Sequence, residues 1–200
     1  MIRIAIAEVI TKIGETLKEK IELAPDFQVA FIAKNGEEMI LQLKEKEIDI
    51  ILMDINMAEM NGNDDIKAIC SNWPYIKIVM SIVFDEEHCI FDSLLAGSIG
   101  VIRKDDPPAK IHRGLYEVLE GGTPMSKNTA KKTLDWLKNH QTQQNKTLKI
   151  PQYLKLEIEI LEHLALGKSY EQIANKLNIS YYNVKTTLEK TSKKLQEANK

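Results

Sequence analysis

Residues 48–57 read Ile48-Asp49-Ile50-Ile51-Leu52-Met53-Asp54-Ile55-Asn56-Met57, a short apolar run that stops at Asp54 and leads into a loop ending at Gly62. Such a continuous apolar run is typical of a strand buried on both faces of a parallel sheet. In these sheets, ligands and chemistry lie at the carboxyl ends of the strands. Asp54 is therefore a candidate phosphoryl acceptor or metal ligand; the plainer alternative is an aspartate that caps the next turn.

The front half of the chain alternates strand-like runs with segments of helical period. Strands are predicted at 2–7, 27–33, 49–54, 76–80 and 99–103, and helices at 12–23, 37–46, 64–71, 86–96 and 107–120. Five successive βα units predict an α/β fold, a doubly wound five-stranded parallel sheet with helices on both faces.

The distribution of charge indicates two modules. Residues 1–122 carry 13 basic and 22 acidic side chains, a net charge of −9, whereas residues 123–150 carry +5 and residues 151–200 carry +2. We therefore expect one domain over 1–122, a helix and linker over 123–150, and a second domain over 151–200. Within the connecting segment, 126–140 is predicted to be helical and 141–149 to be a polar linker. The rear domain is only mildly basic, so charge alone is weak evidence for nucleic-acid binding.

The rear domain has the pattern of a helix-turn-helix. Apolar residues recur at helical spacing over 156–165, and Ser169 is followed three residues later by Gln172, as in a capping box. A tight turn over 178–180 then leads into a longer helix over about 182–195. A short helix, a turn and a longer lysine-bearing helix are typical of DNA-binding modules, and a generic three-helix bundle is the alternative.

Composition excludes several other classes of protein. The chain has 44% hydrophobic and 28% charged residues, as in ordinary globular proteins, and no apolar stretch long enough to cross a bilayer. With no signal-peptide pattern, we expect a cytoplasmic protein with no membrane partner and with Cys70 and Cys89 reduced. The sequence offers no nucleophile–base pair and no glycine-rich phosphate loop, so an independent enzyme is not expected.

Motifs along nearly the whole chain resemble those of two-domain bacterial response regulators of the NarL/LuxR type. This resemblance implies a flavodoxin-like receiver followed by a small all-α helix-turn-helix domain. In the front half it rests on Leu52 to Met57, Met60-Asn61-Gly62, Val79-Met80-Ser81, Leu95-Ala96-Gly97, Gly100 and Lys104-Asp105. In the rear half it rests on Glu159-Ile160-Leu161, Ala165 to Ser169, Ile173-Ala174, Leu177, Ile179-Ser180, Val184-Lys185, Leu188 and Lys194-Leu195.

The resemblance assigns roles around the end of the 49–54 strand. Asp54 would be the phosphoacceptor, with a sensor histidine kinase as the implied partner, and Ser81 and Lys104 would contact the phosphoryl group. A Mg²⁺ cofactor would be held by Glu8, Asp54 and the backbone carbonyl of Asn56.

Departures from the family pattern lie in the same region. Val9 stands where a second acidic metal ligand is usual, and Val101 stands where relatives carry a Tyr or Phe that moves on phosphorylation. Ala58 replaces a loop proline, Asn61 the usual Asp, and Ile82 a small residue. We therefore hypothesise an atypical receiver in which Mg²⁺ binding and phosphorylation at Asp54 are weak or absent. The alternative is an ordinary phosphoswitch in which Glu8 carries the metal.

The resemblance also implies a helix that enters the major groove of double-stranded DNA. Lys185, Thr186, Thr187 and Glu189 fall at or beside DNA-facing positions, and Tyr181, Tyr182, Lys190, Lys193 and Lys194 are candidates for phosphate contacts. Because relatives continue further after this helix, a homodimer would pair through receiver helices or the 126–140 helix. The acidic Glu189 and the modest charge leave a second reading open, a protein-interaction adaptor that no longer reads DNA.

Overall fold

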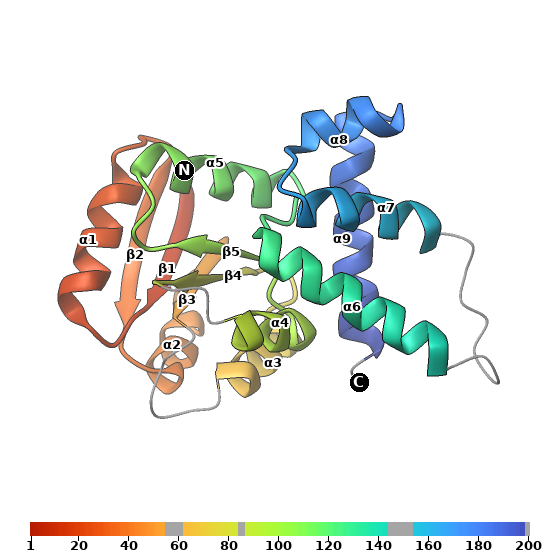
Figure 1. Ribbon diagram of the computed structural model, residues 1–200. Coiled ribbons are helices and arrows are strands. Elements are labelled where there is room, and N and C mark those ends of the chain that lie inside the picture. The colour runs from red at the N-terminus through yellow and green to blue at the C-terminus, as the bar shows by residue number, and fades with distance from the viewer. Residues whose placement is uncertain (55–61, 84–86, 144–153, 199–200) are drawn as a thin grey trace.

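The computed structural model describes residues 1–54, 62–83, 87–143 and 154–198 (Figure 1). Five parallel strands form one sheet in the order β2-β1-β3-β4-β5. Their bounds are β1 (Ile2–Ala7), β2 (Phe27–Ala33), β3 (Ile50–Asp54), β4 (Lys77–Ile82) and β5 (Gly100–Arg103). The predicted doubly wound parallel sheet is confirmed, and the largest difference among the strand bounds is that β4 runs two residues beyond its predicted end. The helix predicted over 37–46 ends at Leu43, three residues before its predicted end.

Helices cover both faces of this sheet. The five are α1 (Thr11–Glu22), α2 (Gly36–Leu43), α3 (Gly62–Asn72), α4 (Glu87–Ala96) and α5 (Pro108–Leu119). Apolar residues of α1 and α5 pack on one face, and those of α2, α3 and α4 on the other (Figure 1). Burying aliphatic side chains on both faces explains why the strands read as unbroken apolar runs rather than as alternating ones.

The central strand β3 carries the candidate acceptor to the carboxyl edge of the sheet. All five residues of β3 are buried between β1 and β4. In the pairing with β4, Asp54 lies opposite Ser81. The parallel register therefore brings these two side chains to the same edge, as the strand ends predicted.

The rear of the chain is helical, with α6 (Lys127–Gln143), α7 (Leu154–Ala165), α8 (Tyr170–Leu177) and α9 (Tyr181–Ala198). Helix α6 extends three residues past its predicted end, into the segment predicted to be a linker. Its residues Ala130 and Leu134 are buried in one apolar core with residues of α7, α8 and α9. The remainder of the predicted linker, over 144–149, lies outside the described residues.

Local signals of the helix-turn-helix are all formed. The Ser169 side chain accepts a hydrogen bond from the Gln172 backbone N–H while the Gln172 side chain accepts one from the Ser169 N–H, which completes the capping box. Asn178 ends α8 in the left-handed conformation, with φ of 54°, and Ser180 caps α9 by accepting from the Asn183 N–H. These caps set the short turn between α8 and α9.

The front and rear halves are in contact. The Val101 N–H of β5 donates to the Pro124 carbonyl at 2.9 Å, which holds the exit segment along the edge of the sheet. The Tyr170 hydroxyl of α8 donates to the Thr123 carbonyl at 2.7 Å. Helix α4 packs against both α6 and α9 (Figure 1). In the part of the chain that the structure describes, no helix is long and apolar enough to span a membrane.

Candidate phosphoacceptor pocket and DNA-reading helix

Three buried charged residues form the core of the candidate receiver site. Lys104 follows β5, and its Nζ lies 3.0 Å from Asp54 Oδ1 and also pairs with Glu8 Oε2. Only 1% of Glu8, 6% of Asp54 and 8% of Lys104 is exposed. The ammonium therefore bridges the two carboxylates and neutralises part of their charge inside the protein.

Ser81 supplies the hydroxyl of this site. It is 1% exposed, and among the described residues its Oγ has no hydrogen-bond partner. A buried hydroxyl without a partner costs free energy, which a phosphoryl oxygen or a similar acceptor at Asp54 would recover. Ser81 thus has the position and the unsatisfied hydroxyl expected of a group that donates a hydrogen bond to a phosphoryl oxygen on Asp54.

In the described arrangement, the carboxylate expected to bind Mg²⁺ is already bonded within the protein. Glu8 uses both carboxylate oxygens, because Oε1 accepts the Ile10 N–H at 3.0 Å and Oε2 pairs with Lys104. Val9 is 43% exposed and offers no oxygen. No three acidic, histidine or cysteine side chains among the described residues are grouped to hold a metal. Mg²⁺ requires near-octahedral oxygen coordination, and Asn56, the remaining predicted ligand, lies outside the described residues.

Val101 fills the position where the family pattern has an aromatic side chain. It is half-buried and packs on the core beneath α2, α3 and α4. An isopropyl group has no ring to turn inward toward Ser81. The backbone N–H of Val101 donates a hydrogen bond to the Pro124 carbonyl, so Val101 contacts the segment that leaves the receiver through its main chain.

On α9, the helix predicted to read DNA, Lys185 faces the receiver. It is 3% exposed, and its ammonium pairs with Glu120, which follows α5. The same ammonium lies 5.0 Å from the centre of the Tyr181 ring. Burial acts to lower the pKa of Lys185, but the hydrogen bond to Glu120 and the nearby Tyr181 and Glu117 outweigh it and raise that pKa. Lys185 is therefore charged and engaged within the chain.

The other residues predicted to meet DNA differ in exposure and in their contacts. Tyr181, Tyr182 and Lys190 are exposed, and Thr186 and Thr187 are half-buried. Glu189 accepts from Lys193 at 2.7 Å and lies so close to Gly121 that a Cβ added there would be 3.1 Å from Glu189 Oε2. Lys194 donates at 2.5 Å to Glu157 of α7, which is 3% exposed. Lys194 thus ties α9 to α7.

Two glutamates at the end of α5 were not among the predicted site residues. Glu120 pairs with Lys185, and Glu117 is half-buried beside Tyr170, with its Oε1 lacking a hydrogen-bond partner among the described residues. In sequence they are only two acidic residues near a helix end. Their importance depends on which helix packs against α5, and the local pattern does not contain that information.

Comparisons with known proteins agree with this two-part architecture. Residues 4–115 match the response regulator receiver domain family, and residues 155–200 match the bacterial regulatory proteins of the luxR family. The chain is 31% identical to the transcriptional regulatory protein LnrK of Bacillus subtilis over 98% of this chain and 91% of that protein. It is 28% identical to the nitrate/nitrite response regulator protein NarP of Escherichia coli over 90% of this chain and 81% of that protein.

A solved structure of two RcsB dimers bound to two parallel DNAs has the same fold. It superposes with a TM-score of 0.58 at 17% identity, covering 98% of this chain and 96% of that one. The receiver and luxR-type matches lie on the two structural units described above, in the same order. The chain therefore belongs to the luxR-type response regulators, DNA-binding transcriptional regulators in which a receiver precedes a helix-turn-helix.

Proposed function

We propose that this regulator is controlled mainly by an input other than Mg²⁺-dependent phosphorylation of Asp54. The observation that carries the proposal is the buried Glu8–Lys104–Asp54 arrangement. Transfer of a phosphoryl group to a carboxylate needs cations that neutralise the phosphoryl oxygens and an acceptor oxygen free to attack in line. Here Glu8 is committed to Lys104 and Ile10, and Val9 supplies no further ligand.

We propose further that α9 reads double-stranded DNA and that the protein acts as a homodimer. Exposed Tyr182 and Lys190 support the first part, since they lie on α9 clear of the receiver. In the arrangement described here the receiver covers Lys185, so full DNA binding requires α5 and α9 to separate. Any ligand or partner that binds one of the two arrangements better shifts the balance between them.

The first experiment measures the intact mass after incubation with a small phosphodonor and Mg²⁺. The samples are wild type, Asp54→Ala, Val9→Asp and the double variant Val9→Asp/Asp54→Ala. We expect no adduct on wild type and a single phosphoryl adduct on Val9→Asp, because the new carboxylate restores a metal ligand. The adduct must be absent from the double variant. A stoichiometric adduct on wild type that disappears in Asp54→Ala would overturn the proposal. The protein would then be an ordinary phosphoswitch with Glu8 as the metal ligand, and a sensor histidine kinase would supply the phosphoryl group.

A specific observation also favours the second candidate function, an adaptor that binds protein. Lys185, Glu189 and Lys194 are all engaged within the chain. The two functions differ in their response to salt, since neutralising phosphates makes affinity for duplex DNA fall steeply with salt concentration. Salt-dependent binding of the full chain to promoter DNA supports the regulator. The variant Glu120→Gln, which removes the charge paired with Lys185, is measured as well, and no binding at low salt by either protein supports the adaptor.

A further inference from the structure

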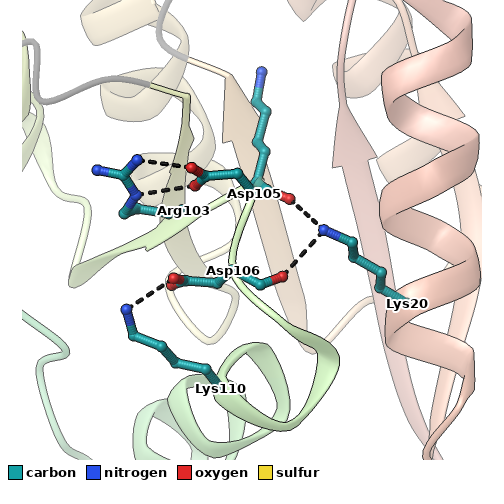
Figure 2. Close-up of polar contacts among 6 residues, drawn as sticks. Lys20, Arg103, Asp105, Asp106 and Lys110 are labelled. Atoms are coloured by element: carbon teal, nitrogen blue, oxygen red, sulfur yellow. Dashed lines mark hydrogen bonds and ion pairs between the residues drawn. The ribbon is translucent and has the colours of Figure 1, made fainter.

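Lys20 of α1 holds the backbone from which Lys104 projects. Its Nζ donates to the Lys104 carbonyl at 2.8 Å and to the Asp106 carbonyl at 3.0 Å. Figure 2 shows the Lys20 side chain extending from α1 to the loop between β5 and α5. We propose that Lys20 is a positioning residue for Lys104, which sets where the Lys104 ammonium lies between Glu8 and Asp54. This inference rests on the proposed function of that ion-paired site.

Side-chain contacts also form within the loop that carries Lys104 and with the first turn of α5. Arg103 donates to both carboxylate oxygens of Asp105 at 2.9 and 2.7 Å, and Lys110 donates to Asp106 at 2.8 Å (Figure 2). These contacts join near neighbours in sequence, so they shape the loop itself. Lys20 adds a charge-assisted link to α1, 84 residues away in sequence.

Both backbone polar groups of Lys104 are bonded to neighbouring elements. Its N–H donates to the Ile82 carbonyl of β4 at 2.7 Å, and its carbonyl accepts from Lys20. A lysine side chain is a flexible four-carbon stem that ends in a point charge. Fixing the stem at its base reduces the number of positions open to the ammonium, so that one ammonium can meet two carboxylates at once.

Helices α1 and α5 are also bonded in the opposite direction. His112 of α5 places Nε2 at 2.8 Å from the Lys20 carbonyl and 3.0 Å from the Ile21 carbonyl. A side chain of α5 thus caps the end of α1, while Lys20 of α1 bonds the loop that precedes α5. At its other end α1 follows Glu8, whose Oε1 accepts the Ile10 N–H. The β1–α1 unit therefore contacts Lys104 twice, at the backbone through Lys20 and at the ammonium through Glu8.

The test is the exchange of the Lys104 ammonium protons with water, followed by ¹H–¹⁵N NMR of the full chain. Lysine ammonium groups in protected ion pairs exchange slowly enough to be seen, and Lys104→Arg identifies the signal by its loss. In Lys20→Met we expect exchange at Lys104 to become about tenfold faster, because removing the bonds to the loop favours local opening. Lys20→Arg, which keeps charged donors, should stay near wild type. Lys12→Met is the control, since Lys12 is exposed on the same helix.

A purely structural role for Lys20 predicts a different result. It would lower the thermal midpoint of unfolding in Lys20→Met while the Lys104 exchange rate stayed at the wild-type value. That outcome overturns the positioning role of Lys20 and leaves the proposed function unchanged. If wild type itself shows no protected Lys104 signal, the ion pair is not formed and the proposed function fails with it. Should Lys20→Met not fold, Lys20→Gln, which keeps one amide donor, takes its place with an intermediate increase expected.

Discussion

Asp65 carries an unusual cost at the scale of a single residue. It is 0% exposed in α3, and neither carboxylate oxygen has a hydrogen-bond partner among the described residues. The carboxylate lies against Gly36, where an added Cβ would be 2.1 Å from Asp65 Oδ2. Burial, followed by the charges of Asp64 and Glu37, raises the pKa of Asp65 above its ordinary 3.8. The native state therefore holds the Asp65 proton more tightly than the unfolded chain does.

We expect Asp65→Asn to raise the free energy of unfolding at pH 7 by about 1 kcal/mol, because it removes a buried charge and keeps the shape of the side chain. A raised pKa destabilises the native state only where the pH is above the ordinary pKa of the group. The gain in the free energy of unfolding should therefore shrink as the pH falls toward 4. Urea unfolding at several pH values measures this gain, with Asp92→Asn as the control, since Asp92 is exposed on another helix and is not among the charges that act on Asp65. A loss of stability that does not change with pH would contradict this account.

Between elements, the Lys194–Glu157 pair joins α9 to α7. The Glu157 side chain is 3% exposed and that of Lys194 is 38% exposed. Removing the cation leaves a buried carboxylate without its charge partner. This lowers the free energy of unfolding by more than the loss of an ion pair at the surface does. The sequence interpretation of Lys194 as a phosphate contact and this packing role predict different phenotypes.

We expect Lys194→Met to lower the free energy of unfolding by about 2 kcal/mol. The double variant Lys194→Met/Glu157→Met should recover most of that loss, since no unpaired charge remains. Lys193→Met is the matched control, because the Lys193 side chain is 65% exposed and its pair with Glu189 lies at the surface. If Lys194→Met instead kept wild-type stability and lost affinity for DNA, Lys194 would be a phosphate contact.

At the scale of the whole molecule, the proposed function has the receiver compete with DNA for Lys185 of α9. Glu120→Gln removes the charge that holds Lys185 against the receiver, and its side chain is 66% exposed, so folding should change little. We expect affinity for duplex DNA to rise about fivefold, or about 1 kcal/mol, as measured by fluorescence anisotropy. Glu15→Gln removes the same charge from an exposed position on α1 and should have no such effect. An equal rise in both variants would mean that net charge alone is responsible.

The contact between α5 and the helix-turn-helix should also depend on pH. Burial raises the pKa of Glu117 above its ordinary 4.5, although Tyr170, Lys185 and Arg113 act to lower it, and Glu120 adds to the rise. Separation of the two halves would expose Glu117 and return its pKa toward the ordinary value. The closed arrangement is therefore stabilised below that value, and this stabilisation is lost as the pH rises through the raised pKa.

DNA affinity of the wild type should consequently rise about threefold as the pH goes from 5 to 7, over and above the change seen in Glu117→Gln. Anisotropy titrations at fixed salt compare the two proteins at each pH. The variant keeps the size of the side chain but cannot titrate, so its curve gives the contribution of all other groups. Parallel curves for the two proteins would exclude Glu117 as the group responsible.

Much of the fold follows from short-range signals in the sequence. Unbroken apolar runs such as Ile50 to Met53 can be buried only between two layers of helices, and Ser169 with Gln172 sets the start of α8 by bonds within four residues. The end of β3 likewise places Asp54 at the carboxyl edge, opposite Ser81. These features depend on periodicity and on local hydrogen bonds, so they could be predicted.

Only the tertiary structure decided which charges meet. Glu8 and Lys104 are separated by 96 residues, and Lys185 and Glu120 by 65, so their pairing depends on how complete elements pack. The same holds for α6, whose sequence indicates a helix but whose burial against α7 makes it part of the helix-turn-helix core. An ion pair needs two side chains at one place in space. The sequence determined the side chains, while the strand order of the sheet and the contact between α9 and the end of α5 determined the place.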